Sequence, residues 1–208
     1  MEMITNSQFK EMMLKYQFAK KRLETELEIL LESYEFKYGY NPVEHKKTRI
    51  KSFGSVCEKL QSKGLDVSVE NITRYIYDMV GMRIVCSFVN EVYEIASIIR
   101  SANEFIIKRE IDYVKEPKDS GYRSYHMHVL IPIHLGEITE YIEAEIQIRT
   151  VAMDCWASLD HKLRYKFVGQ FPEELSKQVA QSANDMMEID KKMQQIADKV
   201  GMIKKNYR

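Results

Sequence analysis

The sequence predicts an α+β fold in which one mixed sheet is flanked by long helices at both ends of the chain. Near both termini, apolar residues recur every three or four positions, as they do on amphipathic helices. Between these ends, segments with the apolar patterns of strands alternate with shorter helical patterns. The 208 residues suit a single domain over residues 1–208.

A long helix is predicted over residues 7–38, because its apolar side chains return in steps of three and four until Asn41-Pro42 breaks the pattern. A short helix is expected over residues 55–63. Another, for which Asn71 could act as the cap, is expected to end near Gly81.

The central part of the chain predicts most of the sheet. Residues 82–88 (MRIVCSF) are typical of a buried strand, and residues 90–102 of a helix. Three further strands are expected at about residues 105–114, 123–134 and 138–149.

Helical patterns continue from residue 150 to the end of the chain. The last of them has an apolar stripe that either covers the sheet or packs against another subunit. It consists of Leu175, Val179, Ala183, Met186, Ile189, Met193 and Ile196. We therefore divide the domain into an N-terminal helix (1–40), a core (41–170) and a C-terminal helix (171–208).

Composition argues against several classes of protein. With 31 basic and 31 acidic residues, the net charge is zero, so a globally basic nucleic-acid binder is not indicated and no stable nucleic-acid partner is predicted. The three cysteines form no CxxC pair, which disfavours a zinc site or a disulfide framework. Neither a signal peptide nor an apolar run of membrane-spanning length is present, so we expect a reduced, cytoplasmic setting without membrane contact.

The most informative strand is YIEAEIQIRT, residues 141–150, where alternation is nearly strict. Apolar residues occupy the even positions from 142 to 148, and the other face carries Glu143, Glu145, Gln147 and Arg149. A solvated polar face is the commoner outcome for such a strand. The alternative is a carboxylate in a cleft beside an amide and a guanidinium, and the strand alone does not decide between them.

Three further segments combine groups that suit a nucleotide. Residues 119–129 (DSGYRSYHMHV) place aromatic, cationic and histidine side chains beside Gly121, although a tight turn explains them equally. The cations of residues 44–52 (EHKKTRIKS) form either solvated surface or a polyphosphate clamp. Asp78 is either a Mg²⁺ ligand or the partner of Arg83 in a salt bridge.

Together, four of these segments resemble the synthetase domain of the RelA/SpoT family, in the same order and spacing. They are RIKS (49–52), DMVGMRI (78–84), GYRSYH (121–126) and EIQIRT (145–150). The likeness covers roughly residues 40–170 and extends to stand-alone small alarmone synthetases, with the RelP type first and the RelQ type second. It implies a nucleotidyltransferase-like mixed sheet, a homotetramer formed through the terminal helices, and pyrophosphate transfer from ATP to the 3′-hydroxyl of GTP or GDP with release of AMP.

The resemblance also implies roles for individual residues. Arg49 and Arg83 would sandwich the adenine of ATP, while Lys51 and Ser52 would hold its phosphates. The catalytic and metal-binding carboxylates would be Asp78 and Glu145, with Mg²⁺ as cofactor and Glu145 as the base for the attacking hydroxyl.

The acceptor nucleotide would contact a second set of residues. Tyr122 would stack on guanine, so that Tyr122→Phe should be mild because the ring face is kept. Lys118, His126 and Gln147 would line this GTP-binding site, and Asp154 would read the guanine edge.

The chain lacks the His-Asp pair that marks the hydrolase domain of bifunctional relatives, since Asp160-His161 has the reverse order. This predicts synthesis without hydrolysis. A guanine-nucleotide- or RNA-binding regulator on the same scaffold, with little catalysis, stays the alternative.

Overall fold

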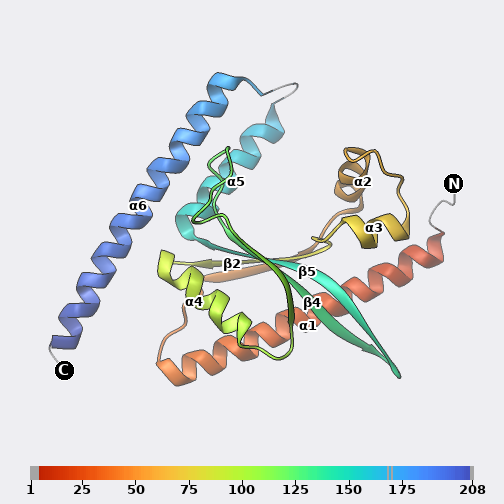
Figure 1. The fold of residues 1–208 in the computed structure, drawn as a ribbon, viewed down its shortest axis with the longest axis horizontal. Helices are drawn as coiled ribbons and strands as arrows, with labels where there is room; N and C mark the ends of the chain where they lie inside the picture. The colour runs from red at the N-terminus through yellow and green to blue at the C-terminus, as the bar shows by residue number, and fades with distance from the viewer. Residues whose placement is uncertain (1–4, 168, 170, 207–208) are drawn as a thin grey trace.

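The computed structural model describes residues 5–167, 169 and 171–206 (Figure 1). In chain order, the elements are α1 (Asn6–Tyr38), β1 (His45–Ile50), α2 (Phe53–Gln61), α3 (Val69–Tyr75), β2 (Val80–Cys86), α4 (Val89–Arg100), β3 (Ile106–Asp112), β4 (Tyr125–Leu135), β5 (Ile138–Thr150), α5 (Val151–Lys166) and α6 (Glu173–Asn206).

The strands form one five-stranded sheet in the order β1-β2-β5-β4-β3. β2 and β5 run parallel, and every other neighbouring pair is antiparallel. The sheet is therefore mixed, as predicted. The parallel pair at its centre brings the first half of the chain next to a strand that comes much later in the sequence.

One face of the sheet is apolar and packs against α1 and α4 (Figure 1). Met82 of β2, Met127 of β4 and Ile146 of β5 are almost completely buried there, and so are Leu23 and Leu27 of α1. Burying each such side chain contributes about 1.5–3 kcal/mol. Because successive side chains of a strand alternate between faces, this core directs the intervening polar residues to the opposite face.

The helix starts follow local capping chemistry. Ser52 and Thr150 accept backbone N–H bonds at the starts of α2 and α5. The predicted cap at Asn71 is wrong: the backbone N–H of Asn71 donates to the Ser68 hydroxyl at 3.1 Å, so Ser68 caps α3. This helix ends at Tyr75 rather than near Gly81, because the chain then enters β2.

Two other expectations need correction. Residues 45–50 form the edge strand β1, which their run of charged residues does not predict, and the helical region after residue 150 divides into α5 and α6. None of the helices in the described part of the chain combines the length and apolar character needed to cross a bilayer.

α6 packs along α5 and α4 (Figure 1). Within the predicted stripe, Ala183 is buried, whereas four other members stay exposed, namely Leu175, Ile189, Met193 and Ile196. The stripe is thus only partly covered by its own chain.

Candidate active site

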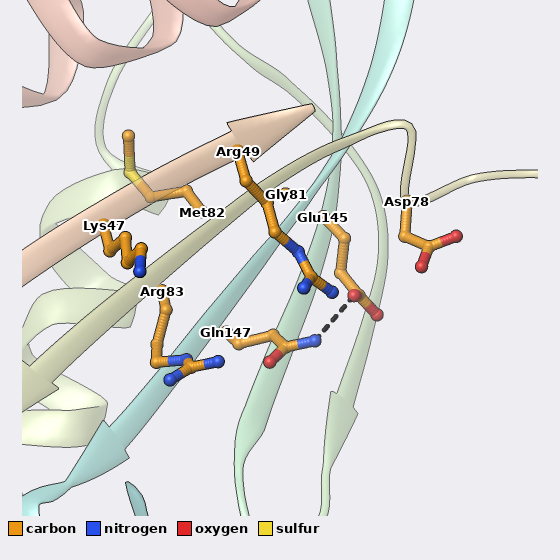
Figure 2. Close-up of a pocket in the computed structure, with 8 residues that line it drawn as sticks. All are labelled: Lys47, Arg49, Asp78, Gly81, Met82, Arg83, Glu145 and Gln147. Carbon is orange, nitrogen blue, oxygen red and sulfur yellow. Dashed lines mark hydrogen bonds between the residues drawn. The ribbon is translucent and has the colours of Figure 1, made fainter. Parts of the chain in front are cut away.

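The polar face of the sheet carries a cavity whose floor is formed by β1, β2 and β5. The strand register places Arg49 opposite Gly81, and Gly81 opposite Glu145. Among the described residues beyond its chain neighbours, a Cβ on Gly81 would meet just Cγ of Arg49 within 4 Å, at 4.0 Å, so the missing side chain leaves the space between Arg49 and Glu145 open. Figure 2 shows both side chains pointing into this space, with Asp78 and Arg83 at its margins.

Asp78 lies in the segment between α3 and β2, where two lysines hold it. Its carboxylate accepts hydrogen bonds from Nζ of Lys51 at 2.6 Å and from Nζ of Lys59 at 2.8 Å. Burial raises the pKa of Asp78, but the two ammonium groups lower it by more than burial raises it. The pKa therefore lies below its ordinary value of 3.8. The carboxylate is therefore ionised at neutral pH.

Glu145 lies on the polar face of β5, as its alternation predicts. Its Oε1 is 2.9 Å from Nδ1 of His126, and its Oε2 accepts a hydrogen bond from Nε2 of Gln147 at 2.7 Å. Burial raises the pKa of Glu145 and the charge of Asp78 adds to this, but the contacts with His126 and Gln147 outweigh both, so the pKa is lowered. A half-buried, ionised carboxylate of this kind is ready to accept a proton or to bind a cation.

Arg149 connects several predicted site residues, although the family resemblance assigned it no role. It is only 5% exposed, and its guanidinium donates to the Tyr122 hydroxyl at 2.6 Å and to Oε1 of Gln147 at 2.5 Å. Nη1 of Arg149 also lies 3.1 Å from Oδ1 of Asp154, which balances its charge. Its place on the polar face of the predicted strand was the available clue.

Tyr122 lies in the segment before β4 and borders a second cavity, between the polar sheet face and α5. Its hydroxyl is 2.8 Å from Nε2 of His126 as well as bonded to Arg149. Nζ of Lys118 lies 5.1 Å from the Tyr122 ring centroid, and Nζ of the same lysine lies 4.8 Å from that of Tyr113. Because the hydroxyl has two partners, Tyr122→Phe removes two hydrogen bonds although it keeps the ring face.

Asp154 lies in the first turn of α5, and its carboxylate joins two arginines. Oδ1 is 3.0 Å from Nη1 of Arg83 and 3.1 Å from Nη1 of Arg149. A contact with a guanine edge would compete with these ion pairs. Arg83 therefore forms its salt bridge with Asp154. The sequence had suggested Asp78 as a possible partner.

Ser52 serves as the N-cap of α2, and its side-chain oxygen accepts the backbone N–H of Ser55 at 3.3 Å. The predicted phosphate contact thus lies at a helix N-terminus, where backbone N–H groups favour anions. Lys47, one of the cations of residues 44–52, lines the first cavity, and Lys59, which the sequence did not single out, pairs with Asp78. Lys59 lies on α2, and only the fold brings it to Asp78.

The sequence matches a family model described as the region found in RelA/SpoT proteins, over residues 48–170. It is also similar to the GTP pyrophosphokinase YwaC of Bacillus subtilis (strain 168). The two are 38% identical over 185 residues, which cover 89% of this chain and 88% of YwaC.

Solved structures of small alarmone synthetases are also similar to this chain. The small alarmone synthetase 1 from Bacillus subtilis bound to its product pppGpp superposes with a TM-score of 0.84 at 30% identity, covering 94% of this chain and 99% of that one. The same synthetase bound to AMPCPP gives a TM-score of 0.77 at 27% identity, over 95% of this chain and 100% of the other. These similarities confirm the predicted α+β fold.

Proposed function

The chain belongs to the RelA/SpoT family, and we propose that it is a small alarmone synthetase that transfers the β,γ-pyrophosphate of ATP to the 3′-hydroxyl of GTP or GDP. The single observation that carries this function is the cavity in which two ionised carboxylates, Asp78 and Glu145, face the arginines Arg49 and Arg83 (Figure 2). A pure nucleotide binder has no need of two half-buried carboxylates beside an anionic ligand, so the geometry favours a synthetase over the non-catalytic regulator.

ATP occupies the β1–β2 side in this proposal. Arg49 and Arg83 border both cavities, and the planar guanidinium group of arginine stacks on aromatic rings, as an adenine sandwich requires. Lys51 and Ser52 follow β1 directly and lie at the start of α2, where cationic and N–H donors suit the triphosphate. In the structure Lys51 neutralises Asp78, so we propose that ATP phosphates compete for this lysine.

The guanine nucleotide occupies the larger cavity between the sheet and α5. Tyr122 borders it together with Gln147 and Arg149, and we propose that its ring stacks on guanine. Arg149 is buried and fixed, whereas Lys118 is exposed, so Lys118 is the cation that an incoming base displaces from the ring. His126 contacts the hydroxyl of Tyr122. Recognition of the guanine edge by Asp154 stays a prediction.

The chemistry of the donor set fits Mg²⁺. Asp78 and Glu145 line one cavity and both stay ionised at neutral pH, and Mg²⁺ commonly takes one or two carboxylates together with substrate phosphates. These two residues would hold the ion. When bound, it would neutralise charge on the transferring phosphates.

The remaining chemistry belongs to the side chains. Pyrophosphoryl transfer depends on positioning and charge neutralisation more than on a covalent nucleophile. Lys51 supplies positive charge to the donor phosphates, and Glu145 accepts the proton of the 3′-hydroxyl. The hydroxyl oxygen forms a bond to the β-phosphorus of ATP while the bond between that phosphorus and the α,β-bridging oxygen breaks, which releases AMP.

For the assembly, we propose a homotetramer held by the terminal helices. The support is the set of apolar side chains that α6 leaves exposed, since contiguous exposed apolar surface typically marks an interaction site. The cytoplasmic location also stays a prediction.

The test incubates the purified protein with ATP, Mg²⁺ and either GTP or GDP, and separates the products by anion-exchange chromatography. We expect AMP and the 3′-pyrophosphorylated guanine nucleotide in equal amounts, and no AMP without an acceptor. Binding of both nucleotides without AMP would instead support the regulator. Conversion of added ppGpp to GDP would contradict synthesis without hydrolysis.

A further inference from the structure

Two hydrogen-bonded paths run from the Arg149 guanidinium to the two carboxylate oxygens of Glu145. On the first path, Nη2 of Arg149 contacts the Tyr122 hydroxyl at 2.6 Å, and this hydroxyl contacts Nε2 of His126 at 2.8 Å. Nδ1 of His126 then contacts Oε1 of Glu145 at 2.9 Å. The second path passes from the same Nη2 to Oε1 of Gln147 at 2.5 Å, and from Nε2 of Gln147 to Oε2 of Glu145 at 2.7 Å.

The two ends of these paths determine the direction of the hydrogen bonds that they make. A guanidinium only donates, and an ionised carboxylate only accepts. The Tyr122 hydroxyl therefore accepts from Arg149, and Nδ1 of His126 carries the hydrogen that Oε1 of Glu145 accepts. The Gln147 amide must likewise turn its oxygen to Arg149 and its nitrogen to Glu145.

We propose that Arg149, Tyr122, His126 and Gln147 form a bracket whose two arms position Glu145 as the base for the acceptor hydroxyl. This inference rests on the proposed function, in which Glu145 accepts that proton. The four residues are positioning residues in this role, because they act on the reaction through Glu145.

The bracket has a clear physical effect on the base. One donor on each oxygen prevents rotation of the carboxylate, while a carboxylate has about four lone-pair sites and so keeps others for a hydroxyl. The charge that supports the bracket is itself fixed, because Arg149 is buried and paired with Asp154. His126 cannot take the proton onward through Nδ1, since that nitrogen already carries the hydrogen donated to Glu145.

A double-mutant cycle tests the two arms. Tyr122→Phe keeps the ring for stacking but removes the hydroxyl from the first arm. We expect kcat to fall about 10- to 100-fold, the range found for outer-shell partners of functional groups in metal sites, with the KM values for ATP and GTP unchanged. Adding His126→Ala, on the same arm, should cause less loss than the two separate effects multiplied. Combining Tyr122→Phe with Gln147→Ala, on the other arm, should lower kcat by at least the product of the two separate fold-losses.

A second pair of variants tests which nitrogen of His126 matters. In His126→Asn the amide nitrogen takes the place of Nδ1 and can still donate to Glu145, whereas His126→Gln puts its amide near the position of Nε2. We expect His126→Asn to retain most of the parental kcat and His126→Gln to lose it. Equal activity of these two variants, or fully multiplicative losses along the first arm, would overturn the bracket.

Glu145→Gln, measured in parallel, separates failure of the bracket from failure of the proposed function. If Glu145→Gln is inactive while the bracket variants keep the parental kcat, Glu145 is the base and the bracket is wrong. If Glu145→Gln retains the parental rate, the assignment of the base fails as well. Thermal unfolding and ATP binding, recorded for every variant, identify any loss of activity that comes from misfolding.

Discussion

Glu145→Gln removes one negative charge from the cavity while keeping the length and volume of the side chain. General acid–base catalysis contributes roughly 10²–10⁴-fold to the rate of a reaction, which corresponds to about 3–5 kcal/mol of transition-state stabilisation. Pyrophosphate transfer should fall at least by this factor, because Glu145 is the proposed base and also a proposed ligand of Mg²⁺.

The structure predicts a second, smaller effect on stability. Both oxygens of Glu145 accept hydrogen bonds, from His126 and from Gln147, but a glutamine at this position has only one accepting atom. Either one donor loses its partner, or Gln147 turns its amide and gives up the bond from Arg149. A lost hydrogen bond costs about 0.5–1.5 kcal/mol, and an unsatisfied buried donor about 1–3 kcal/mol.

The double variant Glu145→Gln/Gln147→Glu separates the two effects. It restores the alternation of donors and acceptors, because a carboxylate at position 147 accepts from Arg149 and from the new amide at position 145. The negative charge has then moved two residues along the same face. We expect the melting temperature to recover while activity stays low. Glu143→Gln, which alters a carboxylate on the same face paired with Lys108, should lose much less activity.

The assay follows AMP and alarmone formation under single-turnover conditions with saturating nucleotides, together with ATP binding by calorimetry. Equal losses in Glu145→Gln and Glu143→Gln would mean that the polar face acts only as a surface. Recovery of activity in the double variant would show that the donor pattern, rather than the charge at position 145, determines the rate. Either result would refute the role of Glu145 as base.

Three further predictions concern stability and assembly. Because the pKa of Asp78 is lowered on folding, its contribution to stability is present above about pH 4 and is lost as the pH falls below that value. The melting temperatures of the parent and of Asp78→Asn should therefore converge at low pH. Gly121→Ala places a Cβ 2.5 Å from Cβ of Ala183 at a φ of +88°. It should lower stability, in denaturant titrations, by about 1–3 kcal/mol more than Gly136→Ala, where φ is +65° and the described residues beyond the chain neighbours place no atom within 4 Å. Removing the chain after residue 170 should dissociate the oligomer in light scattering, and a monomeric full-length protein would contradict the assembly.

The sequence by itself determined which side chains share a face. Strict alternation over residues 141–150 placed Glu145 and Gln147 together on the polar face, and the three- and four-residue steps of 7–38 predicted α1. Both are local periodicities of the backbone, so they can be recognised without knowledge of the rest of the chain. Four ordered motifs added the family, which the comparisons confirm.

The tertiary structure decided which of these groups meet. The pairing of β2 with β5 places Gly81 beside Glu145, and the packing of α2 brings Lys59 to Asp78. Arg149 likewise connects to Tyr122 only because the segment before β4 returns to β5. Strand order, register and helix packing depend on the burial of the whole apolar core, and no local pattern in the sequence contains that information.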